Sequence, residues 1–228
     1  MGPVELSPED AVHALRALRL RPGEAVSVAD GSGRVGTGTF AGERNGAAVV
    51  DVDEVSEVAR PQPRVTVVLA PPKGERLRWA IQKLSELGVA RTVLVEAERS
   101  VRALPADRGD RALNRLRATA REAAMQSRQA FIMEIGRTES IRGFIKESDG
   151  SAILLWELAR APLRMCLPPN ADHVSLIVGP EGGFSEHEVD EAREAGAAIA
   201  SVGPNILRTE TAAVAAAAVT LAHYGRLG

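Results

Sequence analysis

From residue 64 onward, continuous apolar runs alternate with amphipathic stretches, and this alternation constrains the fold more than any other feature of the sequence. The apolar runs occupy residues 65–70, 92–96, 152–156, 174–178 and 199–202. The amphipathic stretches include residues 75–87, 107–128 and 211–224, and a capping-box pattern at Ser185 and Glu188 starts another. Because continuous apolar strands are typical of sheets covered on both faces, the pattern predicts an α/β fold with a parallel sheet.

The first third of the chain has a different pattern, with a short helix expected over residues 8–20 and β-rich stretches after it. These stretches lie at residues 24–29, 34–40 and 46–52. The sequences Asp30-Gly31 and Asn45-Gly46 separate them, and such pairs favour hairpins because both turn positions adopt positive φ. Short strands joined by tight turns predict a small β-barrel.

Prolines mark the boundary between these two patterns. Pro61 and Pro63 interrupt the strand pattern, as expected of a linker. We therefore expect two domains, residues 1–62 and 63–228. The middle of the chain is also distinct in charge. Although 28 basic and 30 acidic residues give a net charge of −2, residues 73–142 hold 15 basic and 9 acidic side chains. This basic segment indicates an anionic partner such as nucleic acid.

Several classes of protein are excluded by what the sequence lacks. No run reaches the eighteen or so apolar residues of a membrane helix, and the N-terminus has no signal-peptide pattern. The single cysteine, Cys166, cannot form an intrachain disulfide, and the four histidines are scattered, so we expect no metal site. These features favour a cytoplasmic protein that does not contact a membrane.

Three strand-to-helix loops carry the residues best suited to chemistry, because ligands bind at the carboxyl ends of parallel strands. The first contains Glu157, the second is the glycine-rich sequence GPEGGFS at 179–185, and the third is GPNILRTETA at 203–212. Glycines allow a ligand to approach the backbone closely. Neither glycine loop matches the dinucleotide or P-loop patterns, and no Ser/His/Asp set suggests a covalent hydrolase. A plain turn and a surface ion pair between Arg208 and Glu210 are the alternatives.

Together with other stretches, these loops resemble the SPOUT class of methyltransferases and, more narrowly, the bacterial 16S ribosomal RNA uridine-N3 methyltransferase family. The other matching stretches are residues 73–76, 81–88, 98–100 and 122–128. The resemblance implies a small N-terminal barrel similar to PUA domains and a C-terminal parallel sheet whose chain threads a trefoil knot. The chain departs from the family at Met125 and Asn205, where glutamate and arginine are common, and in its first residues.

The resemblance also implies S-adenosylmethionine as the cofactor, bound among the three loops. The residues expected to bind it are Leu155, Glu157, Val178, Gly179, Pro180, Glu181, Gly182, Gly183, Val202, Gly203, Asn205, Ile206, Leu207, Thr211 and Ala212. Arg208 is expected to stabilise the anion at uracil N3, because a guanidinium is always protonated, and Glu210 is a candidate base. The residues expected to bind RNA phosphates are Arg99, Arg102, Arg121 and Arg128.

The implied partner is 16S ribosomal RNA or the small ribosomal subunit. The alanine-rich stretch 211–224 and the resemblance favour a homodimer, and burial of this stretch within the monomer is the alternative. Uracil N3 lies on the Watson–Crick edge, so the base must be unpaired or flipped out. Two other functions stay open: a SPOUT methyltransferase that acts on transfer RNA or on a ribose 2′-hydroxyl, and a non-catalytic RNA-binding module. The N-terminal barrel disfavours the first, and the intact cofactor loops disfavour the second.

Overall fold

The chain folds into two compact units, Met1–Arg60 and Pro61–Gly228. The computed structural model describes residues 2–100 and 109–227, and the units are described separately below. Within these residues, none of the helices combines the length and apolar character needed to cross a membrane.

The first unit is an antiparallel sheet with one short helical segment. Its elements are β1 (Pro3–Glu5), α1 (Pro8–Val12), the π-helix η1 (His13–Ala17), β2 (Ala25–Ala29), β3 (Arg34–Arg44) and β4 (Ala47–Glu57). The strands lie in the order β1-β4-β3-β2, so β1 and β2 are the two edges of an open sheet in the described residues. The expected helix is present, although it is α-helical only to Val12. Closure of the sheet into a barrel stays a prediction.

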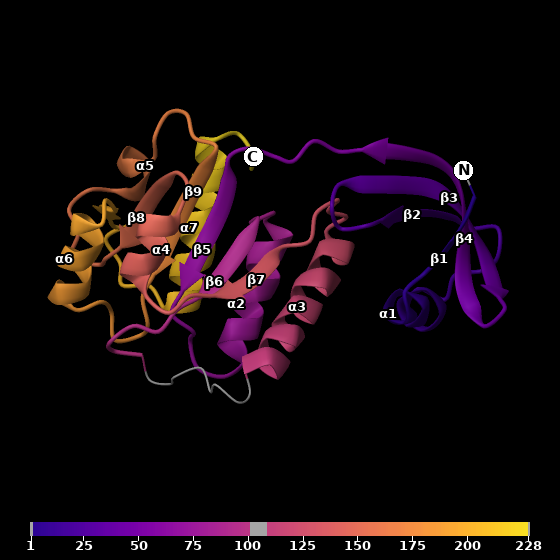
Figure 1. Ribbon diagram of the computed structural model, residues 1–228, viewed down its shortest axis with the longest axis horizontal. Helices are drawn as coiled ribbons and strands as arrows, with labels where there is room; N and C mark the ends of the chain where they lie inside the picture. The colour runs from indigo at the N-terminus through magenta and orange to yellow at the C-terminus, as the bar shows by residue number, and fades with distance from the viewer. Residues whose placement is uncertain (1, 101–108, 228) are drawn as a thin grey trace. The chain divides into compact units, whose positions relative to one another are not determined.

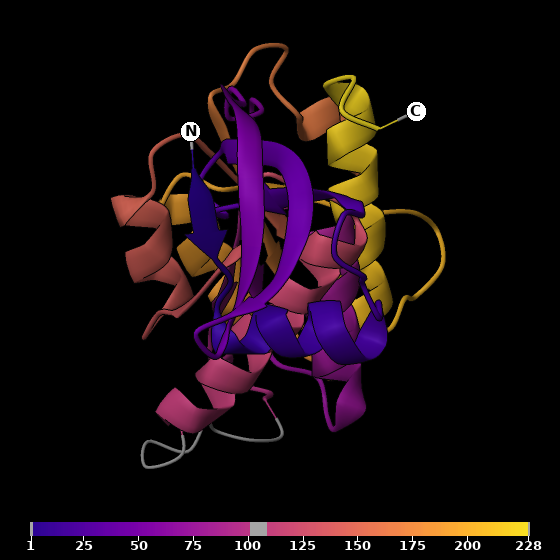
Figure 2. The same ribbon diagram turned by 90° about the vertical axis from the view of Figure 1, so that its right-hand side faces the viewer.

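The long hairpin of β3 and β4 shows how the local sequence builds this unit. Asn45 and Gly46 both have positive φ, 53° and 83°, which confirms the tight turn expected of the Asn-Gly pair. Figure 2 shows the two strands as long ribbons that meet at the turn. Phe40, Val50 and Val52 point to the buried face and pack with Leu15 of η1. The burial of these side chains explains why the helical segment lies against the sheet.

The second unit alternates strands and helices without interruption. Its elements are β5 (Arg64–Leu69), α2 (Glu75–Glu86), β6 (Arg91–Leu94), α3 (Gly109–Gln126), β7 (Glu134–Arg137), α4 (Ile141–Glu147), β8 (Ser151–Leu155), α5 (Leu163–Cys166), β9 (His173–Val178), α6 (Glu186–Glu194), β10 (Ala198–Ala200) and α7 (Thr209–His223). The six strands form one sheet in the order β10-β8-β9-β5-β6-β7, and every neighbouring pair is parallel. The predicted α/β fold with a parallel sheet is therefore confirmed.

Helices cover both faces of this sheet (Figure 1). On one face, Val67 and Leu176 of the strands pack with Leu84 of α2, Leu116 of α3 and Leu221 of α7. On the other face, a second apolar cluster joins the strands to α4 and α6. Burial on both sides explains why the strands are continuous apolar runs rather than alternating ones.

The neighbours β5 and β9 are far apart in the sequence, and the loop after β9 lines the cavity described below. Their register pairs Val68 with Ile177 and Leu69 with Val178. The helix after β5, α2, belongs to the first apolar cluster, whereas the helix after β9, α6, belongs to the second. The two chain segments therefore diverge to opposite faces at the carboxyl ends of these strands. Such a divergence opens a crevice in which ligands of α/β proteins commonly bind.

The structure agrees with the expected helix ends but contains four short elements that were not expected. Helix α2 ends at Glu86, one residue earlier than predicted, and Gly88 follows with a φ of 80°. Helix α6 has the complete capping box of Ser185 and Glu188, as predicted. Four elements are absent from the prediction: β1, β7, α4 and α5. All four are between three and seven residues long, too short for a periodic pattern to identify.

Candidate functional site

A cavity of about 260 Å³ lies where β8, β9 and β10 end. The loops that follow these three strands supply its lining. The lining residues are Leu155, Trp156, Glu157, Val178, Gly179, Pro180, Glu181, Gly183, Phe184, Ser201, Val202, Gly203, Asn205, Ile206, Leu207, Arg208, Thr209 and Ala212. Apolar side chains and glycine backbone dominate, with two carboxylates and one guanidinium among them. Such a cavity suits a ligand with a flat apolar part and a charged end.

Gly183 brings the glycine loop against the loop that follows β8. It has a φ of 69°, a conformation that residues with a side chain rarely adopt. A Cβ atom at this position would lie 2.8 Å from Glu157 Oε1, so the Glu157 carboxylate would have to move. The Gly183 amide donates a hydrogen bond to the Pro180 carbonyl oxygen at 2.9 Å, which closes the loop into a turn. The glycine is thus required both for the turn and for the position of the Glu157 carboxylate.

Arg99 supports the glycine loop. Its Nη1 donates hydrogen bonds to the carbonyl oxygens of Gly182 and Phe184, at 3.3 and 3.4 Å. A Cβ atom on Gly182 would lie 3.1 Å from Arg99 Cβ, so the arginine stem packs directly on the loop backbone. Nearby, the Glu98 amide donates to Glu188 Oε1 at 2.9 Å and connects the same segment to α6. These contacts give Arg99 a structural role in addition to the predicted contact with RNA.

The loop between β10 and α7 forms another wall of the cavity. Arg208 is the N-cap residue of α7, and its side chain makes no capping hydrogen bond. Both Arg208 and Ile206 are exposed, and Ile206 keeps 87% of its surface in contact with solvent. An exposed apolar side chain beside an exposed guanidinium at a cavity mouth suits contact with a second molecule.

Glu210 lies elsewhere than the sequence suggested. It is not among the residues that line the cavity, and its side chain is only 10% exposed. Its Oε1 lies 3.9 Å from Nε of Arg76, a residue of α2, and no ion pair in the described part of the chain joins it to Arg208. Arg76 Nη1 also lies 3.4 Å from Glu181 Oε1. The alternative of a surface ion pair between Arg208 and Glu210 is therefore wrong, because Glu210 faces an arginine from another helix.

The structure brings together nearly all residues predicted to bind the cofactor. Thirteen of them line the cavity with Arg208, whereas Gly182 and Thr211 do not. Gly182 lies behind the loop against Arg99, and Thr211 faces solvent from the first turn of α7. Sequence reasoning missed Trp156, Phe184, Ser201 and Thr209. Their positions inside the same three loops were the available signal.

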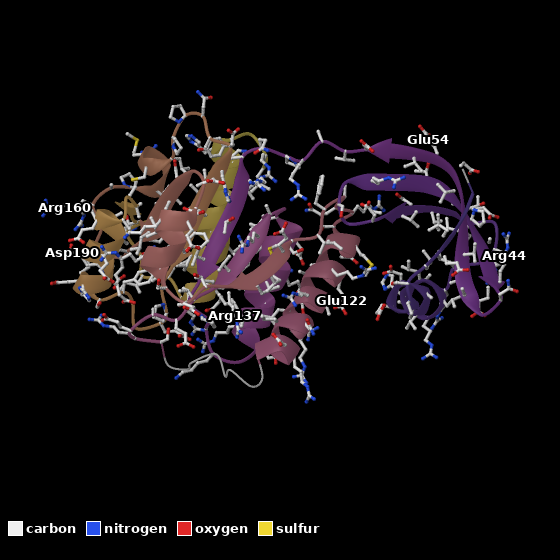
Figure 3. All side chains as sticks on the ribbon, in the orientation of Figure 1. Arg44, Glu54, Glu122, Arg137, Arg160 and Asp190 are labelled. Atoms are coloured by element: carbon white, nitrogen blue, oxygen red, sulfur yellow. The ribbon has the colours of Figure 1, made fainter. Side chains whose placement is uncertain are left out.

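The arginines predicted to bind RNA are not gathered at one place. Arg121 lies in α3 and Arg128 follows its end, while Arg102 lies outside the described residues. A second cavity, of about 520 Å³, lies between α2, α3 and the end of β7, and Figure 3 labels Arg137 and Glu122 of its lining. Its charged residues are Glu75, Arg78, Arg115, Glu122 and Arg137. Three guanidiniums beside two carboxylates give this surface a net positive charge.

Across residues 2–100 and 109–227, no three or more histidine, cysteine, aspartate or glutamate side chains gather as metal ligands would. The charged groups of the first cavity instead face an apolar chamber and glycine backbone.

Comparison with known proteins agrees with this geometry. A family model described as an RNA methyltransferase domain matches residues 59–221. Ribosomal RNA small subunit methyltransferase E of Mycobacterium bovis is 34% identical over 214 residues, which span 91% of this chain and 82% of that protein.

Solved structures of similar proteins superpose over nearly the whole chain. The enzyme of that name from Neisseria gonorrhoeae, solved with bound S-adenosyl methionine, has a TM-score of 0.85 at 27% identity, covering 96% of this chain and 91% of that one. A Legionella pneumophila protein, solved in complex with the cofactor SAM, has a TM-score of 0.86 at 30% identity, covering 97% and 92%. The chain belongs to the ribosomal RNA small subunit methyltransferase E family of RNA methyltransferases.

Proposed function

We propose that this chain transfers a methyl group from S-adenosylmethionine to N3 of a uridine in 16S ribosomal RNA. The ribosomal RNA substrate and the cofactor follow from the family, and the solved relatives described above hold the same cofactor. The choice of N3 rests on the motifs of residues 179–185 and 203–212. The observation that carries the proposal is the cavity at the ends of β8, β9 and β10, which combines glycine backbone with carboxylates.

The residues of this cavity fit such a cofactor. Leu155, Val178 and Leu207 offer apolar walls to an adenine ring, and the absence of a side chain at Gly183 leaves its backbone accessible. Glu157 and Glu181 place negative charge beside the cavity, which favours a cationic ligand group. S-adenosylmethionine supplies a methyl group on a positively charged sulfur.

The protein must make uracil N3 nucleophilic. Neutral uracil carries a proton at N3, and negative charge develops on the ring as this proton leaves. Arg208, exposed at the cavity mouth and not used for capping α7, is the group that we assign to stabilise that charge. The proton passes to solvent at the exposed mouth.

Glu210 is better suited to another role than that of the base. Its carboxylate lies outside the cavity lining and faces Arg76. A base must come within hydrogen-bond distance of the proton that it removes. We therefore assign Glu210 to the electrostatic support of the cavity wall, which is developed below.

The finer architecture is also part of the proposal. The N-terminal domain, residues 1–62, closes into a PUA-like barrel that contacts RNA, and residues 63–228 form a knotted catalytic domain. We further propose a homodimer that forms through the outer face of α7 in the cytoplasm. Ala213, Ala216 and Ala217 are buried within the unit, so only the opposite face, with Val219 at 38% exposure, is available for a partner. Light scattering at micromolar concentration tests the dimer, and a monomeric mass would contradict it.

The decisive experiment is mass-spectrometric mapping of methylated uridines in 16S ribosomal RNA from a strain that lacks this protein. One N3-methyluridine is expected to disappear, and to return with the wild-type protein but not with Arg208→Ala. The purified protein is then given naked 16S RNA, assembled small subunits and transfer RNA. Loss of a 2′-O-methyl group, or methylation of transfer RNA alone, would replace the proposed substrate. No change in any nucleotide, together with RNA binding, would favour a non-catalytic module.

A further inference from the structure

Arg76 occupies the point where β5 and β9 send their following segments to opposite faces of the sheet. It lies in the first turn of α2, directly after β5. Its Nη1 lies 3.4 Å from Oε1 of Glu181, which belongs to the glycine loop after β9. Its Nε lies 3.9 Å from Oε1 of Glu210, in the first turn of α7. One guanidinium thus faces two acids from two different walls of the cofactor cavity.

The two acids depend on Arg76 to different degrees. Glu181 also accepts a hydrogen bond from the Lys73 amide at 3.3 Å and is 27% exposed, so it has other partners. Glu210 is 10% exposed, and within the described residues its Oε2 is buried without a hydrogen-bond partner. A carboxylate removed from water needs a compensating charge nearby. Arg76 is the cation that the structure places beside it.

Displacement of either acid would alter the cavity. Glu181 itself lines the cavity between Pro180 and Gly183. Glu210 follows Arg208 and Thr209, which line the cavity from the loop before α7. A change in the Arg76 contacts therefore acts on both walls at once, although Arg76 itself does not line the cavity.

We propose that Arg76 is a positioning residue, which holds the glycine loop and the start of α7 at the separation that cofactor binding requires. The ion pair joins Arg76 to Glu181, two residues that lie 105 positions apart in the chain. The inference rests on the proposed cofactor, S-adenosylmethionine. It assigns Arg76 to the cofactor-binding step, whereas Arg208 is assigned to methyl transfer.

The chain offers a closely matched control. Arg142 of α4 is 42% exposed, as Arg76 is, and it also faces two acids, Glu191 at 3.2 Å and Glu194 at 3.9 Å. Those acids belong to α6 and do not line the cavity. A comparison of Arg142→Met with Arg76→Met therefore separates the effect of losing a surface ion pair from the effect of losing an ion pair beside the cofactor cavity.

The test is calorimetric titration of the full-length chain with S-adenosylmethionine. Arg76→Met is expected to raise the dissociation constant about tenfold, equivalent to about 1.4 kcal/mol, while kcat at saturating cofactor falls less than about threefold. Arg76→Lys is expected to recover part of the lost affinity. An ammonium keeps the positive charge, but it lacks the planar guanidinium that contacts both acids. Arg142→Met is expected to bind as the wild type does.

A double variant tests the bridge itself. Combining Arg76→Met with Glu181→Gln is expected to weaken binding by less than the product of the two single effects, because the pair acts together. If Arg76→Met does not fold, Glu210→Gln must raise the dissociation constant instead, because Glu210 faces Arg76 and does not line the cavity.

Three results would overturn the inference: unchanged affinity in the folded Arg76→Met variant, a lower melting temperature with unchanged affinity, or an equal loss in Arg142→Met. Failure of the wild-type protein to bind S-adenosylmethionine would instead refute the proposed function. The two failures are therefore distinguishable.

Discussion

The two halves of the six-stranded sheet share one architecture and differ in the charge of the cavities at their carboxyl ends. In both halves the strands are parallel, and their carboxyl ends carry the loops. The loops after β8, β9 and β10 line the smaller cavity with glycines, Glu157, Glu181 and Arg208. The cavity at the ends of β6 and β7 is lined by leucines, three arginines and two glutamates.

This difference indicates a division of labour on a common scaffold. A net negative cavity favours a cationic cofactor, whereas a net positive one favours the phosphates of RNA. The first cavity takes its charges from the loops after the strands, whereas the second takes most of them from helices α2 and α3. The predictions below test whether substitutions in each half affect different steps.

The largest effect is expected at Gly183. In Gly183→Val, a β-branched residue must adopt a φ of 69° with its Cβ 2.8 Å from Glu157 Oε1. The strained backbone alone costs about 1–3 kcal/mol, and the steric overlap adds to it. We expect affinity for S-adenosylmethionine to fall by about a hundredfold or more. Gly136→Ala in β7 is the control from the other half, because its Cβ would meet the nearest atom at 3.4 Å. Wild-type affinity in a folded Gly183→Val protein would contradict the site.

Arg208→Ala is expected to lower kcat on the order of a hundredfold, with little change in cofactor affinity. The reason is that its charge stabilises the transition state rather than the bound cofactor. Arg208→Lys should recover little activity, because an ammonium lacks the planar fork. Steady-state kinetics with saturating RNA, alongside calorimetry, measures the two effects separately. Weakened cofactor binding with normal kcat would make Arg208 a binding residue.

A smaller effect is expected in the arginine-lined half. Arg137→Ala should raise KM for the RNA substrate about threefold to tenfold, and weaken its dependence on salt, since one phosphate contact is lost. Cofactor affinity should stay unchanged. Arg193→Ala on α6, whose side chain pairs with Asp190, serves as the surface control. A loss of cofactor affinity in Arg137→Ala would show that the two halves are not separate sites.

The smallest effect is expected on stability, and it arises from His173 at the end of the sheet opposite the cavities. His173 begins β9, and its Nε2 lies 2.7 Å from Thr66 Oγ1. Burial, followed by the positive charge of Arg64, lowers the pKa of His173 below its usual value, with Asp149 acting in the opposite direction. The folded protein therefore binds this proton less readily than the unfolded chain. Stability from this group is complete above about pH 6.5 and decreases as the pH falls toward the lowered pKa.

We expect the free energy of unfolding to decrease by less than about 1 kcal/mol over this range, because His173 is only partly buried and water screens its charge. Urea titrations at several pH values measure it. His173→Gln removes the titrating group and should flatten this part of the pH dependence without changing methyl transfer. If the free energy of unfolding of His173→Gln depends on pH as that of the wild type does, the pH dependence arises from other groups.

Local signals in the sequence explain the parts of the fold that could be predicted. The Asn45-Gly46 turn, the capping box at Ser185 and the end of α2 before Gly88 all depend on residues within a few positions of one another. The loops that line the first cavity were also identifiable, because glycines and acids directly follow apolar strands. Short elements such as β1 and β7 could not be identified, since three or four residues carry no measurable period and, unlike β10, these strands form no apolar run.

The amino-acid sequence by itself determined the strand and helix segments, the turns and the composition of the loops, because these depend on backbone preferences and on the spacing of apolar residues. Only the tertiary structure decided that β9 lies between β5 and β8. That placement brings Arg76 to Glu181 and turns Glu210 toward Arg76 instead of Arg208. Electrostatic contacts depend on distance in space, and the strand order sets that distance for residues far apart in the chain.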